Sequence, residues 1–595
     1  QSSVRLNKRN AKKLLLSWFT FDMCGIFLVK ARDTQSTSLI TRLASHFRSN
    51  DHCKVEDECI KQCLRRRGPD CESCYTDNET IFSFASVLWH QGGGPFPQPV
   101  NKDGLIFLWN GDVFGAGKDQ YTSDTECVFN ALSSCKSEQE ILQTFENLTG
   151  PWSFVLYDTV KDKIWFGRDI LGRHSLLFSQ SEGCLVVSSL SINCLCEEGE
   201  CSIPSLEELP AVGIYCYNVL SGRTTLYQWD LSIPRLPTPL IEVSSITLKS
   251  SVSFSINDAV PSPMDLEIFS GVCSPIDLLK NSLFAGYVEN LIIKLRQAVR
   301  LRVDATCPYC HACCKKVHLD ENSRCKHPKV GVLFSGGIDS AVLAYLLHEC
   351  LPPGETIDLI NVAFSGDGDF MTPDRETGLA ALQDLESTCC GRSFNFVQVN
   401  VSKDELQQMR HKRIGHLLKP CQSVLDDSIG SALWFAARGI GYLRGQAYSS
   451  PSRVLLVGMG ADEQLAGYSR HRHAFCNHGW AGLTKELETD LRRISIRNLG
   501  RDNRIIGDHG REGRYPFLDE TVVAYLNSVP IWVKANMSFP RGVGEKLLLR
   551  LAAHSLGLIT ASCFPKRAIQ FGSRIAKLEN KKEKGSDMCE RLLSS

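Results

Sequence analysis

Two glycine-rich segments contain the residues best suited to bind a chain of phosphates. In the first, Ser335-Gly336-Gly337-Ile338-Asp339-Ser340 directly follows the apolar residues 330–334. Glycines let a backbone approach an oxyanion closely, and a helix beginning after them would offer free N–H groups. The hydroxyls of Ser335 and Ser340 would donate further hydrogen bonds, whereas Asp339 could meet a phosphate only through a bridging Mg²⁺. Because the segment has no lysine, it is not the P-loop of kinases and GTPases.

The second segment, Val457-Gly458-Met459-Gly460-Ala461-Asp462-Glu463, also follows an apolar run. Ligands of α/β sheets bind at the carboxyl ends of the strands. Asp339 and Asp462 could therefore hold one or two Mg²⁺ ions on a triphosphate. A tight strand-to-helix turn with capping serines is the alternative interpretation of the first segment taken alone, and the second segment makes it less favoured.

Near the start of the chain, Cys24-Gly25-Ile26 directly follows Met23. If Met23 is removed, the α-amino group of Cys24, with a pKa of about 7.7–8.0, can act as the general base for its own thiol. A buried structural cysteine is the alternative. Asn110 and Gly111 would supply an amide side chain and a backbone N–H, which suits an oxyanion hole. Asp124 follows a turn and could hold an ammonium group.

The elements that must position these residues differ along the chain. Residues 24–190 contain short strand patterns separated by turn clusters, which predicts a layered α+β domain rich in antiparallel strands. Residues 191–284 are rich in Pro and Ser with weak periodicity, which predicts a linker or insertion. Over 285–577 apolar strands alternate with helical patterns, which predicts an α/β domain with a parallel sheet buried on both faces. Residues 578–595 form a charged tail.

The composition is that of an ordinary globular protein. The chain has 595 residues, of which 43% are hydrophobic and 22% charged, and its 66 Lys and Arg balance its 66 Asp and Glu. At about 100–200 residues per domain, this length predicts about two to four domains. Zero formal net charge disfavours non-specific binding to nucleic acid or anionic membranes, and no apolar run of about 18 residues predicts a membrane span. We interpret the 26 cysteines as reduced thiols of a cytoplasmic protein.

Residues 1–22 carry five basic residues before any acidic one, followed by a short apolar stretch. A mitochondrial presequence or a poor signal peptide would share these features, but no small-residue cleavage site follows. We favour Met23 as the initiator, with residues 1–22 not part of the mature protein.

Four segments occur in the order found in one enzyme family. SGGIDS (335–340), GMGADEQLAGY (458–468), RYPFLD (514–519) and GEKLLLR (544–550) resemble the synthetase domain of glutamine-dependent asparagine synthetases. Residues 24–190, with Cys24, Asn110-Gly111-Asp112 and Asp124, resemble the glutaminase domain of the same enzymes. The resemblance implies an N-terminal-nucleophile glutaminase-like domain of α+β class, followed by an α/β adenine-nucleotide α-hydrolase-like (PP-loop) domain with a parallel sheet.

The resemblance also implies roles for individual residues. In the first domain, Cys24 would attack the glutamine amide, Asn110 and Gly111 would stabilise the oxyanion, and Asp112 and Asp124 would bind glutamine. In the second domain, the pyrophosphate of ATP would be bound by Ser335, Gly336, Gly337, Asp339 and Ser340. Leu333 and Gly458 would touch the adenosine, with Ala363 near the base. Asp339 and Asp462 would hold Mg²⁺, and Lys566 or Arg567 would stand in for the pyrophosphate-binding lysine of the family.

The implied protein is a glutamine-hydrolysing, asparagine synthase-like ligase. Glutamine would be hydrolysed at Cys24, and the ammonia would reach an aspartyl-adenylate to give asparagine, AMP and pyrophosphate. Glutamine, aspartate and ATP would be the substrates, Mg²⁺ would be the cofactor, and a homodimer is possible. A third hypothesis keeps adenylation but uses another carboxylic acid.

Two departures keep a hypothesis of another class open. Met459 stands where the family has a glutamate, and a thioether cannot accept a proton or hold a cation as a carboxylate does. Residues 85–89, around Val87, contain no arginine, although the family has one there that clamps the α-carboxylate of glutamine. Losing a bidentate contact of this kind weakens binding by about 2–5 kcal/mol. The alternative is therefore a degraded relative that binds nucleotide or partners without completing either reaction.

A cysteine-rich segment lies just before the first glycine-rich one. Its cysteines and histidines have a zinc-like spacing, over Cys307, Cys310, His311, Cys313, Cys314, Cys325 and His327. A small zinc-bound loop and a flexible thiol-rich loop both fit this spacing. We favour the thiol-rich loop, because a Cys-x-x-Cys pair needs a matching second pair to be a strong signal.

Overall fold

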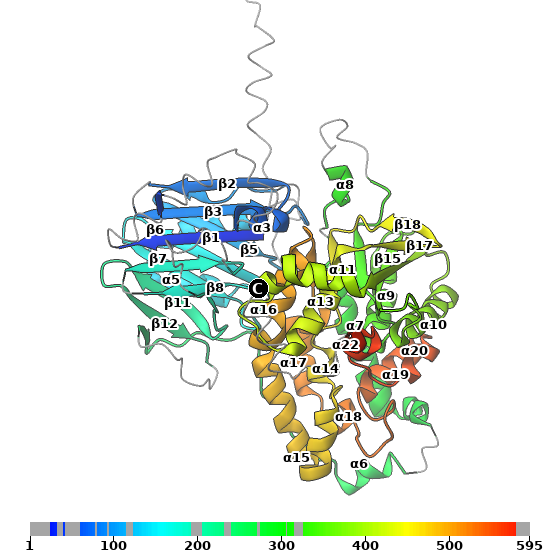
Figure 1. The fold of residues 1–595 in the computed structure, drawn as a ribbon. Helices are drawn as coiled ribbons and strands as arrows, with labels where there is room; N and C mark the ends of the chain where they lie inside the picture. Colours follow the sequence, from blue (N-terminus) through cyan, green and yellow to red (C-terminus); the bar gives the residue numbers. More distant parts are fainter. Residues whose placement is uncertain are drawn as a thin grey trace, which may run out of the picture.

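Two domains lie side by side in the computed structural model of the chain (Figure 1). The predicted extension over residues 1–22 and the tail from residue 579 onward lie outside the described residues. The structure describes residues 24–32, 40–41, 60–77, 80–91, 95–114, 123–181, 183–191, 205–230, 240–270, 274–304, 306–314 and 325–578.

The first domain is built on two antiparallel sheets that pack face to face. Ile26 and Leu28 of one sheet pack with Ile106 and Leu108 of the other. The first sheet has the order β10-β8-β9-β1-β3-β2, with β1 (Cys24–Ala31), β2 (Cys71–Thr76), β3 (Ile81–Val87), β8 (Leu177–Gln180), β9 (Cys184–Ser188) and β10 (Glu207–Glu208).

The second sheet has the order β13-β12-β11-β7-β6-β5-β4, and only its edge pair β12–β13 is parallel. Its strands are β4 (Val100–Lys102), β5 (Leu105–Gly111), β6 (Trp152–Asp158), β7 (Lys163–Arg168), β11 (Gly213–Asn218), β12 (Arg223–Gln228) and β13 (Ile241–Val243). The described helices are α3 (Ile60–Arg67), α4 (Asp124–Ser133) and α5 (Glu138–Glu146). Every residue of β3 and β6 is buried, because these strands are covered on both faces.

The predicted linker over 191–284 is wrong for much of its length. Strands β10 to β13 fall inside it, and they extend both sheets of the first domain. Proline and serine flank these strands and hide a short alternating pattern, which is clearest in β11, where Tyr215 and Tyr217 pack between the sheets. The rest of the segment runs onto the second domain, where the backbone N–H of Asn257 donates to the carbonyl of Asn527 at 2.8 Å.

The second domain contains one seven-stranded sheet with the order β18-β17-β16-β15-β14-β19-β20. The strands are β14 (Val330–Leu333), β15 (Ile357–Ser365), β16 (Phe394–Ser402), β17 (Ile440–Leu443), β18 (Gln446–Ser449), β19 (Val454–Leu456) and β20 (Glu512–Arg514). Five neighbouring strands of this sheet are parallel: β16, β15, β14, β19 and β20. The other two, β17 and β18, form an antiparallel hairpin at the edge. The strand order therefore reverses between β14 and β19, which is where open α/β sheets place their ligand crevice.

Helices cover both faces of this sheet. One face is covered by α7 (Ser282–Leu301), α9 (Ile338–Cys350) and α19 (Leu547–Ser555), whose apolar residues pack on Val330 and Val332. The other helices named below are α8 (His311–Cys314), α10 (Pro373–Thr388), α11 (Lys403–Met409), α13 (Val424–Arg438), α14 (Ala461–Gln464), α15 (Ser469–Ile494), α16 (Gly500–Gly507), α17 (Glu520–Ser528) and α18 (Ile531–Lys534). None of the described helices is long and apolar enough to cross a bilayer.

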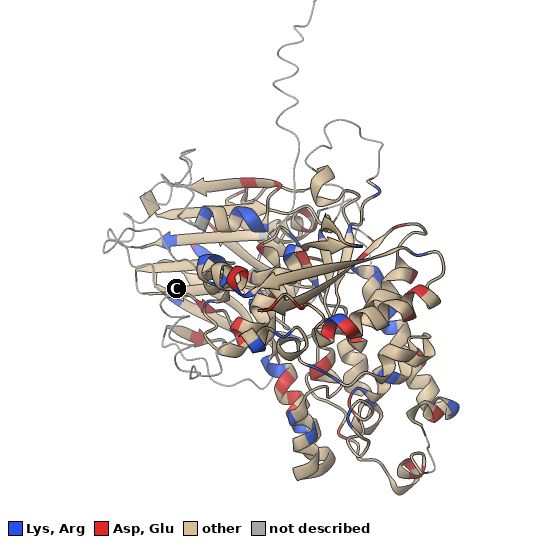
Figure 2. Cartoon of the chain, turned by 45° about the vertical axis from the view of Figure 1, so that its right-hand side comes forward, with Lys and Arg blue, Asp and Glu red and all other residues tan. Residues whose placement is uncertain are grey.

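Buried ion pairs join the two domains. Each pairs an arginine with a carboxylate of the other domain: Arg453 with Asp70 at 2.6 Å, Arg173 with Glu520 at 2.6 Å, and Arg514 with Asp112 at 3.1 Å. Figure 2 shows that acidic and basic residues are interspersed along the elements of both domains.

Candidate active site

The loops after β14 and β19 touch at the switch point of the sheet. Asp339 lies in the first turn of α9, and Asp462 lies in the first turn of α14. A Cβ atom added to Gly458 would lie 2.9 Å from the Cβ of Asp339, closer than side-chain atoms normally approach. The glycine of the second segment is therefore what allows the two loops to meet.

Lys546 lies between the two aspartates. Its Nζ is 2.7 Å from Oδ2 of Asp339 and 2.6 Å from Oδ1 of Asp462. Lys566 also forms an ion pair with Asp462. A Cβ at Gly467 would overlap the Asp462 carboxylate and the Lys546 side chain, so a glycine is needed beside this pair. The two carboxylates thus converge on one cation, as ligands of a shared site must.

The charges of this cluster stabilise one another. Burial favours the neutral form of Lys546, but Asp339 and Asp462 outweigh it and raise the pKa of the ammonium group. Burial likewise opposes ionisation of Asp462, but Lys546 and Lys566 hold the pKa of its carboxyl well below the usual range. Asp462 is therefore ionised, and Lys546 charged, at neutral pH.

The predicted phosphate loop has the shape that anion binding requires. Gly336 has a φ of 77°, and a Cβ there would lie 2.3 Å from the backbone nitrogen of Gly378. Gly337 caps α9 without a side-chain hydrogen bond. The hydroxyl of Ser335 accepts from the Gly337 N–H at 3.2 Å, and that of Ser340 donates to the Gly337 carbonyl at 2.9 Å. The start of α9 is therefore directed at the space beside Asp339.

The remaining residues of the predicted ATP site are spread around this loop. Leu333 ends β14 and is half-buried, and Ala363 lies fully buried on the neighbouring strand β15. Of the two predicted basic residues, only Lys566 contacts Asp462. Arg567 is exposed and acts instead on Asp374, where it opposes the burial that raises the pKa of that carboxyl to about 7. Lys566 is thus the better placed of the pair.

These residues fit a magnesium nucleotide by the chemistry of their donors. Two carboxylates supply the oxygen ligands that Mg²⁺ prefers, and the first turn of α9 and two lysines supply positive partners for phosphate. Lys546 was not predicted as a site residue, although it lies within the GEKLLLR segment. Its φ of 55° is unusual for a non-glycine residue and marks a constrained position.

The family glutamate that Met459 replaces has no substitute among its described neighbours. Met459 is half-buried and packs against the apolar core. Glu463 lies four residues after Met459, but its Oε1 accepts from the Tyr468 hydroxyl at 2.7 Å and from Asn498 at 2.9 Å, and its Oε2 accepts from the Gly460 N–H at 3.1 Å. A cavity of about 100 Å³ opens beside Lys566 and is lined in part by Arg472, His473, Met537 and Arg541.

In the first domain, the structure describes the two residues predicted to form an oxyanion hole, and only the backbone of Cys24. Cys24 begins β1 and pairs with Val87 of β3, and the structure does not describe its side chain. Asn110 and Gly111 end β5 on the facing sheet. Asn110 is fully buried, and neither its amide nitrogen nor its oxygen has a hydrogen-bond partner among the described residues. Leaving a buried amide without hydrogen bonds costs free energy of folding. Such an amide is expected where a bound substrate supplies the missing partners.

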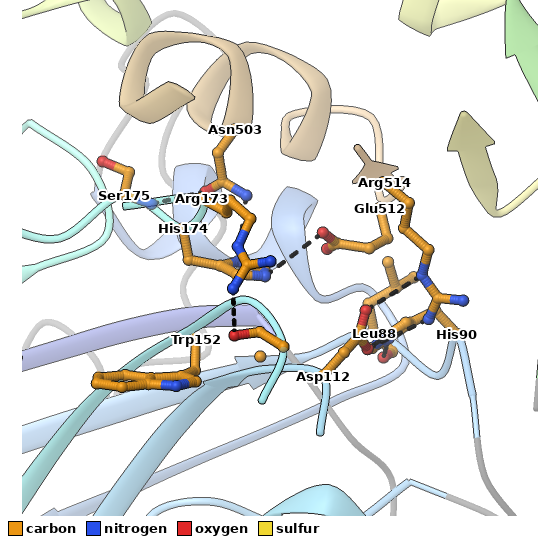
Figure 3. Close-up of polar contacts among 12 residues, drawn as sticks. Leu88, His90, Asp112, Trp152, Arg173, His174, Ser175, Asn503, Glu512 and Arg514 are labelled. Atoms are coloured by element: carbon orange, nitrogen blue, oxygen red, sulfur yellow. Dashed lines mark hydrogen bonds and ion pairs between the residues drawn. The ribbon is translucent and has the colours of Figure 1, made fainter. Parts of the chain in front are cut away.

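The two predicted glutamine-binding carboxylates contact the protein itself. Asp112 lies 2.5 Å from Nε2 of His90 and 3.1 Å from Nε of Arg514, which reaches it from the second domain (Figure 3). Burial opposes ionisation of Asp112, but Arg514 and His90 hold its pKa well below the usual range. Asp124 accepts from the side-chain amide of Gln91, whose oxygen accepts from Arg514 at 2.9 Å.

His90, Gln91 and Arg514 were not predicted as site residues. His90 and Gln91 follow the stretch that lacks the family arginine, and Arg514 begins the RYPFLD segment. Their contacts make Asp112 an anchor of the domain interface. Its role in binding glutamine, like that of Asp124, stays a prediction.

Comparison with known proteins identifies the family. Residues 324–482 and 476–595 match the model named asparagine synthase. Asparagine synthetase domain-containing protein 1 of Mus musculus is 39% identical, over 89% of this chain and 95% of that protein. The chain belongs to the asparagine synthase family. Residues 115–196 also match the glutamine amidotransferase domain model, a match that begins after Asn110 and does not include Cys24.

Further family members match over nearly their whole length. The Bos taurus protein of the same name is 40% identical, over 89% of this chain and 94% of that one. Asparagine synthetase domain-containing protein CG17486 of Drosophila melanogaster is 35% identical, over 90% and 96%. The predicted family and fold class are therefore confirmed: a glutamine amidotransferase-like domain precedes a synthase domain with a mostly parallel sheet.

Proposed function

We propose that the second domain activates a carboxylic acid with ATP and transfers ammonia to it, with aspartate as the expected acid and asparagine as the product. The single observation that carries this proposal is the convergence of Asp339 and Asp462 on Lys546 at the switch point of the sheet. Two acidic side chains and a lysine at a strand-end crevice, beside an uncapped helix start, are suited to a magnesium triphosphate.

The proposed amide synthesis has two steps. The carboxylate oxygen attacks the α-phosphorus of ATP and pyrophosphate leaves, which gives an acyl-adenylate. Ammonia then attacks the acyl carbon, AMP leaves, and the nitrogen loses a proton to solvent. Lys546, Lys566 and the start of α9 neutralise the charge that builds up on the leaving pyrophosphate. Mg²⁺, when bound by Asp339 and Asp462, would add positive charge on the same phosphates.

The cavity beside Lys566 is the candidate pocket for the acceptor acid. Arg472, Arg541, Lys566 and Glu545 line it, and because its basic residues outnumber Glu545, which pairs with Arg472 at 3.1 Å, the cavity suits a dicarboxylic acid such as aspartate. Arg472 also donates to the carbonyl of Met537 at 2.6 Å, which holds its guanidinium in place. Because Met459 supplies no carboxylate, the proton lost by ammonia has to be accepted by another group or by water.

For the first domain we propose glutamine hydrolysis at Cys24, with Asn110 and Gly111 as the oxyanion hole. The unpaired amide of Asn110 supports this proposal. A second candidate is favoured by the contacts of Asp112 and Asp124, whose carboxylates are held by Arg514 and Gln91. In that case the glutaminase half is inactive, and free ammonia is the nitrogen source of the synthetase half.

One assay separates these outcomes. The protein starting at Cys24 is incubated with ATP, Mg²⁺, aspartate and either ammonia or glutamine, and asparagine and pyrophosphate are measured. Product from both nitrogen sources supports both halves, and product from ammonia alone supports the second candidate. Pyrophosphate without asparagine indicates another acceptor acid. No product and no pyrophosphate, with nucleotide still bound, would overturn the ligase proposal and favour a degraded relative.

A matched pair of variants tests whether pyrophosphate release depends on the candidate ATP site. Asp339→Asn should abolish pyrophosphate release, because it removes a charge that pairs with Lys546. Asp404→Asn changes an exposed carboxylate on α11 and should leave the release unchanged. Equal loss in both variants would assign the effect to general destabilisation.

A further inference from the structure

Three cysteine sulfurs and one histidine nitrogen converge just before β14. The ligand atoms of Cys310, Cys313, Cys325 and His327 all lie within 4.8 Å of one another. They come from both ends of the cysteine-rich segment: Cys310 and Cys313 are at α8, and Cys325 and His327 precede β14 by a few residues. The cluster belongs to neither the proposed ATP site nor the glutaminase site.

The distances within the cluster match those between ligands of one tetrahedral metal ion. The sulfurs of Cys310, Cys313 and Cys325 lie 3.5, 3.4 and 3.2 Å from Nδ1 of His327. With zinc bonds of about 2.3 Å to sulfur and about 2.0–2.1 Å to nitrogen, tetrahedral geometry places a sulfur about 3.6 Å from the nitrogen. Hydrogen bonding alone does not explain this arrangement, because one imidazole nitrogen has one N–H or one lone pair to share among three sulfurs.

The surrounding backbone is arranged as it is around metal-bound thiolates. The N–H of Cys313 donates to the sulfur of Cys310 at 3.4 Å, and the N–H of His327 donates to the sulfur of Cys325 at 3.3 Å. Such bonds stabilise the thiolate form and orient the ligands. The ligand set, Cys-x₂-Cys followed by Cys-x-His, has the three cysteines and one histidine typical of closed structural zinc sites.

The structure also separates these four residues from the others of the segment. Cys307 is buried, and its backbone N–H donates to the carbonyl of His90 at 2.9 Å. The thiol of Cys314 interacts with that of Cys307. His311 donates through its backbone to Pro451 at 3.0 Å. The spacing by itself left seven candidate ligands, and the fold brings four of them together.

We propose that Cys310, Cys313, Cys325 and His327 bind one structural zinc ion. All four positions of the tetrahedron would be filled by the protein, so the ion has no open position for catalysis. The segment that carries the first two ligands crosses the domain interface, where Tyr309 packs on Trp89 with ring centroids 5.7 Å apart. The zinc would thus fasten this segment beside His90, the residue that contacts Asp112. Figure 1 shows α8 at the top of the second domain.

The test is a metal analysis of the full chain. Purified protein should contain about one zinc per chain, and Cys325→Ser and His327→Ala should each lower that ratio at least about tenfold. Two control variants should keep the zinc: Cys314→Ser, which changes a thiol of the same helix outside the cluster, and Cys390→Ser, which changes an exposed thiol far from it in sequence. Loss of zinc from the controls as well would overturn the assignment to these four residues.

A second measurement uses the wild-type chain, so its result does not depend on whether a variant folds. The wild-type chain is stripped of metal under reducing conditions and titrated with Co²⁺, which should give thiolate-to-cobalt charge-transfer bands and the visible bands of tetrahedral cobalt. Addition of Zn²⁺ should remove both. Absence of these bands, iron in place of zinc in the purified protein, or a disulfide among Cys310, Cys313 and Cys325 in protein kept from air would each overturn the proposal.

Discussion

At the scale of single residues, the candidate ATP site depends on Lys546. This lysine is almost fully buried and pairs with both Asp339 and Asp462, of which only Asp462 has a second lysine partner, Lys566, among the described residues. A buried charge pair that loses one partner leaves the other desolvated and uncompensated. The contribution of Lys546 should therefore be larger than that of an exposed lysine.

Replacing Lys546 with methionine should weaken ATP binding by about 2 kcal/mol or more, which is at least about 30-fold. Methionine keeps the length of the side chain but removes its charge. Fluorescent-nucleotide titration measures the affinity, and circular dichroism checks the fold. Lys403→Met, at an exposed position of α11, is the control and should leave the affinity unchanged. Unchanged affinity in Lys546→Met would remove this residue from the site.

Gly458→Ala tests the contact of the two loops. The added methyl would lie 2.9 Å from the Cβ of Asp339, so the loops must separate, and we expect weaker ATP binding with a lower melting temperature. Gly286→Ala is the control, because a Cβ there meets no atom within 4 Å. Since Gly286 lies inside α7, in its second turn, that change should instead stabilise the protein by about 0.5–1 kcal/mol. Equal behaviour of the two variants would contradict the close approach at Gly458.

At the scale of elements, the strand order explains why the two glycine-rich segments share one site. Helix α9 follows β14 and α14 follows β19, and the order of the sheet reverses between these two strands. Ligands of open α/β sheets bind at such a reversal, outside the carboxyl ends of the strands. The same edge continues to β20, whose last residue, Arg514, extends to the first domain.

Helix α18 contains a buried lysine that makes stability depend on pH. Lys534 is fully buried, its Nζ has no hydrogen-bond partner among the described residues, and burial lowers its pKa to about 7. Between that value and the ordinary lysine pKa, the folded chain has released a proton that the unfolded chain still binds. Stability therefore rises with pH in this window, by up to about 1.4 kcal/mol per pH unit, and the gain is absent below pH 7.

Lys534→Met removes this titrating amino group and should raise the melting temperature at pH 7. Between pH 7 and 9 the melting temperature of the wild type should rise relative to that of the variant. Differential scanning fluorimetry across this range measures both curves. Parallel curves would show that Lys534 does not titrate in this window.

At the scale of the whole molecule, the domains are held by buried charges rather than by an apolar surface alone. Glu520, at the start of α17, accepts from Arg173 at 2.6 Å and from the backbone N–H of Gly150 at 2.9 Å. Burial opposes its ionisation, but Arg173 outweighs it and lowers the pKa of the carboxyl. The stabilisation is present above the usual glutamate pKa and is lost as the pH falls through the lowered value.

Glu520→Gln should destabilise the interface by about 1–3 kcal/mol, because it removes one of the two carboxylates that pair with the buried Arg173 and leaves only Asp169. Thermal unfolding should then show the domains melting less cooperatively. Glu242→Gln breaks an exposed pair with Arg223 and should cost less than about 1 kcal/mol. A melting curve of Glu520→Gln that overlays the wild-type curve would contradict the role of this pair.

Much of the fold could be predicted because its patterns are local. The antiparallel strands predicted for residues 24–190 are confirmed by β1 to β9, and Asp339 and Asp462 were expected together because both follow apolar runs. The linker prediction failed because short strands flanked by proline and serine lack a clear period. The glutamine-binding assignments of Asp112 and Asp124 rested on the resemblance to the family, which does not reveal that Arg514 reaches Asp112 from 402 residues away.

The amino-acid sequence alone determined the two domain types and the acidic and glycine-rich segments, since propensity and turn chemistry act over a few neighbouring residues. Only the tertiary structure decided which distant groups meet: Lys546 between two aspartates, Gln91 on Asp124, and four of seven candidate ligands around one point. Lys546 is 207 residues from Asp339. Such contacts depend on how sheets and helices pack, and no short stretch of sequence encodes that packing.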